Sequence, residues 1–419
     1  MRAKDKTGAF ATLVAGLLLM LALPAPATVI TVDIAGSGDF ASIQDGIDAA
    51  SPGDTVLVLP GTYFETPYIG STKDGITLRS SGGAELTIVD SDHTPATAVL
   101  TCEDVGASTL VEGFTIMGGS GIGTGAGISC INASPAISHN IITDCFPASV
   151  QAEGGGLGVR NGSPHIHHNT IVANNGSDGA GVMIWGGAPL VEANNITDNN
   201  GWGFGGNNAG AGIAAWEASP QIVGNTISHN DASYAAGIAL VDCSDVLLAD
   251  NTILGNTVAY WGGALDVVRS SVTATGNRFI QNEAGGIGAC LRLSSVPEGS
   301  VAVFEDNVFF GNVGPDQAIA VNDPRARFSG NYLVDACPYQ VSAPTCTTPD
   351  SLDFTGNWWG SADSASIEAL VFDATDDPGR CVIDFSEWCL DPSCTGTATT
   401  VPEQQELSWG RLKSLYAAP

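Results

Sequence analysis

The chain has 419 residues, of which 53 are glycine and only 14% are charged, and its formal net charge at pH 7 is −30. A charge this negative repels polyanions, so we do not expect nucleic acid as a partner. Abundant glycine with few charges is typical of tight turns repeated many times.

The N-terminus has the pattern of an export signal. Three basic residues lie within residues 2–6, an apolar run spans 11–23, and small residues for cleavage stand at 25–27. We expect residues 1–27 to be removed, which leaves 11 basic and 43 acidic residues and a net charge of −32. A retained membrane anchor is the alternative, but the run is short for a bilayer. We therefore expect a secreted, extracellular protein without a transmembrane segment, either free or attached to the cell surface.

Near-copies of one stretch recur along most of the chain. SPAISHNIITDC (134–145), SPHIHHNTIVANN (163–175), APLVEANNITDN (188–199) and SPQIVGNTISHN (219–230) are four of them. Their leading asparagines continue through later copies at spacings of 24 to 31 residues: Asn140, Asn169, Asn194, Asn225, Asn251, Asn277, Asn307, Asn331 and Asn357. Each of the first four follows a glycine-rich strand start by 13 residues, counted from Gly127, Gly156, Gly181 and Gly212. Strands this short must bury their apolar residues against the next copy.

The pattern predicts an all-β fold, a single-stranded right-handed parallel β-helix with three short strands per turn. Asparagine suits its bends because it tolerates left-handed backbone geometry and its amides can bond from turn to turn. Another kind of solenoid or a β-sandwich is the alternative. We expect a monomer.

Two segments carry a resemblance to a known family. GDFASIQDGIDAASPGDTVLVLPGTYFE (38–65) resembles the opening of pectin-lyase-like proteins, in which a short helix caps the first turn, and NWWGSADSASIEALVFDATDDPGRCVIDFSEW (357–388) resembles the closing segment of bacterial right-handed β-helix proteins. The resemblance implies a β-helix over 28–355, a closing segment over 356–394, and a linker and tail over 395–419. It implies no particular chemistry, because the fold hosts many functions and this chain lacks the motifs of the polygalacturonases, alginate epimerases and pectin methylesterases.

The ten cysteines suggest some disulfides in an exported chain. Cys337 and Cys346 could close a short loop, and one pair is expected among the cysteines at 381, 389 and 394. Cys102 and Cys130 hold equivalent repeat positions, so we expect them to be stacked, buried thiols.

A cluster of histidines raises the question of a metal site. His165 and His167 flank Ile166, which aligns with inward positions, so both should point outward with Glu192 one turn away. Two histidines and a carboxylate could hold zinc. Exposed polar residues on a solvated sheet explain them equally well.

Aromatic residues suggest a binding face. Arg160, Trp185 and Trp216 fall in one outward column on three consecutive turns, and Trp202 and Trp261 lie in the adjoining loops. Rows of exposed aromatics suit pyranose rings, whose C–H faces stack on tryptophan. Alternatively, the loop aromatics fold over the two tryptophans and only close the face.

Catalytic residues are less marked. Glu217 and Asp242 share a column on consecutive turns, at a separation that suits a glycosidase pair. A lyase would need calcium, for which Asp242 and Asp266 are candidates, together with an arginine such as Arg269. No cofactor is otherwise implied.

These observations favour a secreted, polysaccharide-associated β-helix protein that binds a polysaccharide or cell-surface glycan through its tryptophan face. A polysaccharide lyase or glycoside hydrolase acting on the same face is the first alternative, and a structural or adhesive surface solenoid is the second.

Overall fold

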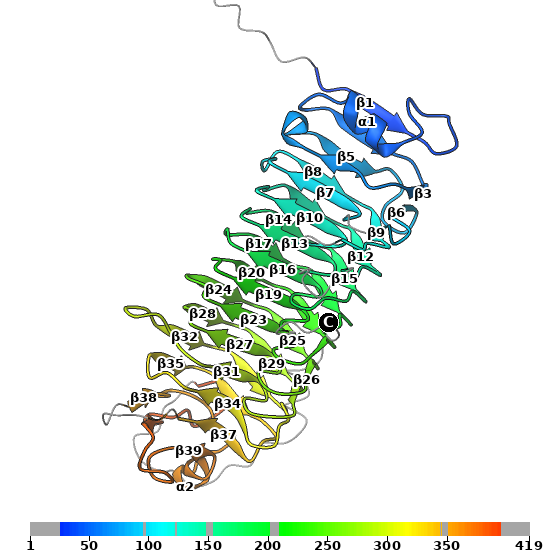
Figure 1. Ribbon diagram of the computed structural model, residues 1–419. Coiled ribbons are helices and arrows are strands. Elements are labelled where there is room, and N and C mark those ends of the chain that lie inside the picture. Colours follow the sequence, from blue (N-terminus) through cyan, green and yellow to red (C-terminus); the bar gives the residue numbers. More distant parts are fainter. Residues whose placement is uncertain are drawn as a thin grey trace, which may run out of the picture.

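The computed structural model describes residues 26–94, 98–121, 124–147, 154–201, 209–343, 345 and 351–394. Over these ranges the backbone winds into an elongated right-handed parallel β-helix (Figure 1). Neighbouring strands of its three long sheets pair in parallel, as the repeat predicted. Residues 1–25 of the expected export signal and the tail at 395–419 lie outside the described residues.

The three long sheets run the length of the solenoid, one strand from each turn. Sheet A contains β1 (Val29–Val32), β2 (Thr55–Val58), β5 (Thr77–Ser80), β8 (Leu110–Glu112), β11 (Ala136–Ser138), β14 (His165–His167), β17 (Leu190–Glu192), β20 (Gln221–Val223), β24 (Val246–Ala249), β28 (Val272–Thr275), β32 (Ala302–Glu305), β35 (Ala326–Ser329), β38 (Ser351–Asp353) and β40 (Val382–Asp384). Sheet B contains β3 (Gly61–Phe64), β6 (Thr87–Asp90), β9 (Thr115–Met117), β12 (Ile141–Thr143), β15 (Thr170–Val172), β18 (Asn195–Thr197), β21 (Thr226–Ser228), β25 (Thr252–Leu254), β29 (Arg278–Ile280), β33 (Val308–Phe310) and β36 (Tyr332–Val334).

Sheet C carries the aromatic face. It contains β4 (Tyr68–Ile69), β7 (Leu100–Glu103), β10 (Ile128–Ile131), β13 (Leu157–Arg160), β16 (Val182–Trp185), β19 (Ile213–Trp216), β23 (Ile238–Val241), β27 (Leu265–Val268), β31 (Leu291–Leu293), β34 (Gln317–Val321), β37 (Tyr339–Ser342) and β39 (Val371–Phe372). A short fourth sheet, in the loops that lead into sheet C, contains β22 (Asp231–Ala232), β26 (Thr257–Val258) and β30 (Glu283–Ala284).

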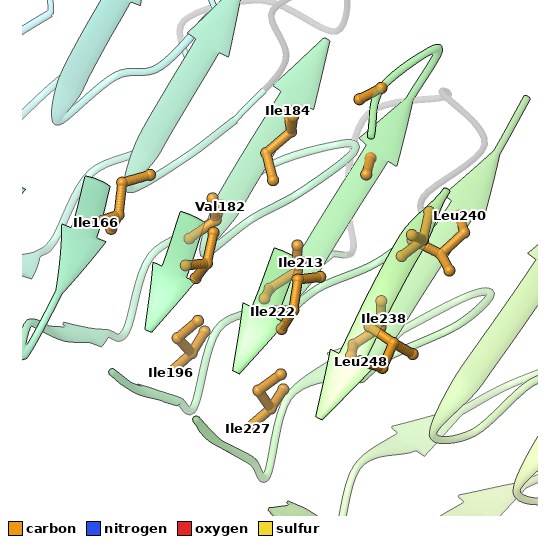
Figure 2. Packing of buried hydrophobic residues seen from close by; sticks show 14 of the residues in the cluster. Ile166, Val182, Ile184, Ile196, Ile213, Ile222, Ile227, Ile238, Leu240 and Leu248 are labelled. Atoms are coloured by element: carbon orange, nitrogen blue, oxygen red, sulfur yellow. The ribbon is translucent and has the colours of Figure 1, made fainter. Parts of the chain in front are cut away.

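Inward aliphatic residues stack turn upon turn to form the core. Ile137, Ile166, Val191 and Ile222 are in-register partners on successive strands of sheet A, and all four are 0% exposed. Figure 2 shows this stacking for residues from all three sheets. Burying one such side chain contributes about 1.5–3 kcal/mol, so each turn is stabilised mainly by its neighbours.

Two ladders of buried asparagines hold the bends in register. In the first ladder, each Nδ2 donates to the Oδ1 of the asparagine on the next turn, at 2.9–3.1 Å, from Asn140 to Asn357. The second runs from Asn174 to Asn312 in the same way and ends on the carboxylate of Asp335. The predicted stacking of bend amides is therefore confirmed.

Both ends of the core are covered. At the N-terminal end the helix α1 (Ile43–Ala49) buries Ile43 and Ile47, and the carboxylate of Glu65 accepts hydrogen bonds from its first backbone N–H groups. The C-terminal turns contain α2 (Ser364–Glu368). A 3-10 turn lies at Ser71–Lys73. Within the described ranges, no helix has the length and apolar composition needed to cross a bilayer.

The cysteines divide into two groups. Cys389 and Cys394 form a disulfide, as expected for one pair in this segment, and Cys381 is also disulfide-bonded. Cys102 and Cys130 are stacked, buried free thiols, as predicted. The expected disulfide at Cys337 is wrong: its thiol is free and packs against the core, 3.6 Å from a backbone carbonyl oxygen.

Candidate functional site

The predicted outward column on sheet C is present. Arg160, Trp185 and Trp216 end strands β13, β16 and β19 and are in-register partners. The two indole rings lie 5.2 Å apart between centroids, and the Arg160 guanidinium lies 5.5 Å from the centroid of Trp185. Both tryptophans are half-buried. The parallel register therefore turns a sequence repeat into a row of aromatic surfaces.

Loop residues extend this row along two further turns. The ring of Tyr234 stacks on Tyr260 at 4.9 Å and contacts Trp261 at 4.5 Å. These loops lead into β23 and β27, the turns that follow Trp216. We call Trp185, Trp216, Tyr234, Tyr260 and Trp261 the aromatic ribbon.

A small apolar cluster supports the ribbon from below. Met183, Ala214 and Ala239 occupy the outward side of sheet C and are covered by the loops, with Ala209 and Ala235. Trp185, Trp216 and Tyr234 pack against this cluster. The loops therefore do close over part of the sheet, but the ribbon itself keeps exposed surface, most of all Tyr260, which is 50% exposed.

A buried ion pair anchors the far end of the ribbon. Arg292 donates to both carboxylate oxygens of Asp266, at 2.8 and 2.6 Å, and its guanidinium lies 4.8 Å from the centroid of Trp261. Asp266 and Arg292 are partners on β27 and β31. Burial raises the pKa of Asp266 while Arg292 opposes that rise. The sequence indicated Asp266 as a calcium candidate and not as the partner of Arg292. The 26-residue spacing between the two, which is one turn, is the signal that they pair.

The expected acid pair lies at a corner of the solenoid. Glu217 and Asp242 follow the last residues of β19 and β23 and have φ of 50° and 53°, as does Arg269 with 46° one turn later. Similar left-handed bends recur in this position along the chain, so the conformation belongs to the fold and not to a special site.

Asp242 is already neutralised by a neighbour. Arg269 donates to both its oxygens at 2.6 Å. These hydrogen bonds with Arg269 hold the pKa of Asp242 below its ordinary value. A general acid needs the opposite shift. Bidentate arginines also occupy the oxygens that Asp242 and Asp266 would offer to calcium.

The histidines form a cluster over sheet A. A hydrogen bond of 2.9 Å joins His165 Nε2 to a carboxylate oxygen of Glu192. The Nδ1 atoms of His167 and His168 lie 3.0 Å apart. His139 stacks on His168, which lies one turn further along, with ring centroids 5.2 Å apart. Burial and the neighbouring imidazoles lower the pKa of His167. Across the described residues, no group of three histidine, cysteine or acidic side chains is arranged to hold a metal ion.

The remaining predicted binding residue, Trp202, lies outside the described residues. Two surface cavities lie away from the ribbon. One, of about 240 Å³, is lined by residues of β24 and β28 with the loop at 299–301, and the other, of about 420 Å³, lies around β40.

Comparison with known protein families gives a match over part of this chain. Residues 188–333 match the family model described as a right handed beta helix region, a range that includes Trp216 and Trp261. This match agrees with the parallel winding, so the fold of the described residues is a right-handed β-helix, as the sequence resemblance implied. No curated protein matches it.

Solved structures with a similar winding are distant. Pectin methylesterase PemA from Erwinia chrysanthemi is 13% identical, with 78% of this chain and 92% of that chain covered and a TM-score of 0.33. A mannuronic acid-specific polysaccharide family 6 lyase from human gut microbiota is 12% identical, with 74% and 86% covered and a TM-score of 0.32. We draw no argument about activity or substrate from likenesses at this level.

Proposed function

We propose that this protein is a secreted, polysaccharide-associated β-helix protein that binds glycan chains on the aromatic ribbon. The observation that supports this most is a row of two ring pairs, Trp185 with Trp216 and Tyr234 with Trp261. One apolar cluster joins the two pairs, because Trp185, Trp216 and Tyr234 all pack against it. Partly exposed aromatic rings offer apolar surface against which sugar C–H groups can pack. The export-type N-terminus agrees with an extracellular ligand.

Binding without cleavage fits the charged residues better than catalysis does. Asp242 and Asp266, two of the three acids expected to act, each accept two hydrogen bonds from an arginine. Such a pair must be broken before the carboxylate can act as acid, base or calcium ligand. Breaking the buried Asp266–Arg292 pair is costly, whereas the exposed Asp242–Arg269 pair opens more easily. Glycan retention is therefore the function we propose, with cleavage as an outcome of its test.

The test uses the mature chain, residues 28–419, on a panel of insoluble polysaccharides with and without calcium. We expect retention without release of fragments. Tyr260→Ala should weaken retention without unfolding the protein, because this ring is half-exposed. The double variant Trp185→Ala with Trp216→Ala should weaken it by about tenfold or more, since stacked rings contribute about 0.5–1.5 kcal/mol each.

Phe64→Ala is the matched control, because Phe64 is an aromatic residue with 69% exposure on β3 of sheet B, several turns before the ribbon. Retention lost equally in the control would contradict a specific role for the ribbon. Fragments with unsaturated ends would establish a lyase, and hydrolytic fragments a glycosidase. No retention on any glycan would leave a structural solenoid.

A further inference from the structure

On the basis of the proposed function, we infer that the ligand is an uncharged glycan with an extended, β-linked backbone, lying along the solenoid axis. Two independent features of the ribbon support this inference. The arginines around it already have partners within the protein, and its rings are spaced at about one turn of the solenoid.

The arginines around the ribbon are all engaged with groups of the protein itself. Arg292 is held by both oxygens of Asp266, and the side chains of this pair are only 18% and 7% exposed. Arg269 is held in the same bidentate manner by Asp242. Arg160 donates to the hydroxyl of Thr124 and lies against the ring of Trp185.

A uronate needs a cation that can meet its carboxylate. At Arg269 and Arg292 it would have to displace an aspartate that already satisfies the guanidinium geometry. At Arg160 it would compete with the hydroxyl of Thr124. Exposed Glu217, which directly follows Trp216, would repel it as well. An uncharged sugar meets neither obstacle, because stacking and hydroxyl hydrogen bonds require no counter-charge. The charge arrangement therefore selects against acidic glycans.

The spacing of the rings indicates the direction of the chain. Trp185 and Trp216 lie on adjacent turns with centroids 5.2 Å apart, and Tyr234 and Trp261 belong to the loops entering the next two turns. Turns rise by about 4.8 Å, which is close to the length of one sugar in an extended chain. A flat β-linked chain laid along the axis would place about one sugar on each turn over about four turns.

Calorimetry on the mature chain with two matched pairs of oligosaccharides tests both features. The pairs are β-1,4-linked mannose and mannuronate oligomers, and β-1,4-linked glucose and glucuronate oligomers, which differ only in the oxidation of C6. At least one neutral oligomer should bind at least tenfold more tightly than its uronate, and the difference should shrink at high salt because screening weakens the repulsion. Affinity should rise with length up to about four sugars and then level off. Tyr260→Ala should lower it.

The outcomes separate the two proposals. A uronate that binds as tightly as its neutral partner, with loss on Tyr260→Ala, overturns this inference and leaves the proposed function standing. Affinity that does not change between two and four sugars overturns the axial arrangement. Binding of neither member of either pair, with polysaccharide retention also absent, overturns the proposed function itself.

Discussion

Replacement of Asn251 by alanine tests whether the asparagine ladders hold the solenoid together. Asn251 is 0% exposed. Its Nδ2 donates to the carbonyl oxygen of Ile222 at 2.7 Å and to Asn277 at 2.9 Å, and its Oδ1 accepts from the backbone and the side chain of Asn225 at 2.9 and 3.0 Å. Alanine removes all four hydrogen bonds without reducing the apolar core.

The expected loss is large for one small side chain. Each bond contributes about 1 kcal/mol, and the backbone N–H of Asn225 is left buried without its partner, so we expect the free energy of unfolding to fall by about 4 kcal/mol. Asn195→Ala is the matched control, because Asn195 is exposed on β18 and the same substitution there should change stability by less than about 0.5 kcal/mol.

Urea denaturation followed by circular dichroism measures the difference, and limited proteolysis shows whether the chain opens near β24 and β25. Because solenoids unfold through their nearest-neighbour interfaces, cleavage should begin at the altered turn. A loss below about 1 kcal/mol, or a loss equal to that of the control, would refute the view that the ladder bonds are individually important.

Three further expectations concern buried or clustered charges. Burial raises the pKa of Asp335 to about 6, so its contribution to stability is greatest below about pH 4 and is lost as pH rises through 6. Asp335→Asn should therefore raise the free energy of unfolding by about 2 kcal/mol at pH 7 and leave it unchanged at pH 4. Urea titration at the two pH values measures this difference. The pKa of His167 is lowered, so stability falls as pH drops below about 6.5, where the unfolded chain takes up the proton first. His167→Gln should make the melting temperature depend less on pH between 7 and 5. An unchanged pH dependence of the melting temperature would contradict this. Arg292→Leu leaves the carboxylate of Asp266 buried without a partner and should lower the free energy of unfolding by about 3–5 kcal/mol. Adding Asp266→Leu in the same chain should restore most of this loss. If the double variant is no more stable than Arg292→Leu alone, the two residues do not act as a pair.

The repeat spacing made the fold and the columns predictable. Because Asn225 follows Gly212 by 13 residues, as Asn194 follows Gly181, the register of neighbouring strands could be written from the sequence, and with it the pairing of Trp185 with Trp216. In-register stacking leaves little freedom once the period is known.

Side-chain partners and loops did not follow from that spacing. The sequence places Asp242 and Arg269 at successive corners, but only the folded geometry shows that the guanidinium turns onto the carboxylate. Tyr234 and Trp261 stand in loops whose lengths differ from turn to turn, so no repeat fixes where their rings meet. Cys337 was misjudged because a short spacing to the next cysteine says nothing of where the core lies.

The continuity of the two asparagine ladders has a consequence for how this molecule can change its length. From Asn174 to Asn312 the asparagine of each turn donates its Nδ2 to the Oδ1 of the asparagine on the turn after it, so the same bond is repeated at every step. If the chain is divided at the same position in two different turns, the exposed ends have the same hydrogen-bonding groups. Whole turns can therefore be removed or duplicated, whereas part of a turn cannot. The aromatic ribbon occupies four consecutive turns. These turns can therefore be duplicated, or inserted into another β-helix of the same repeat, without changing the first and last turns of the solenoid.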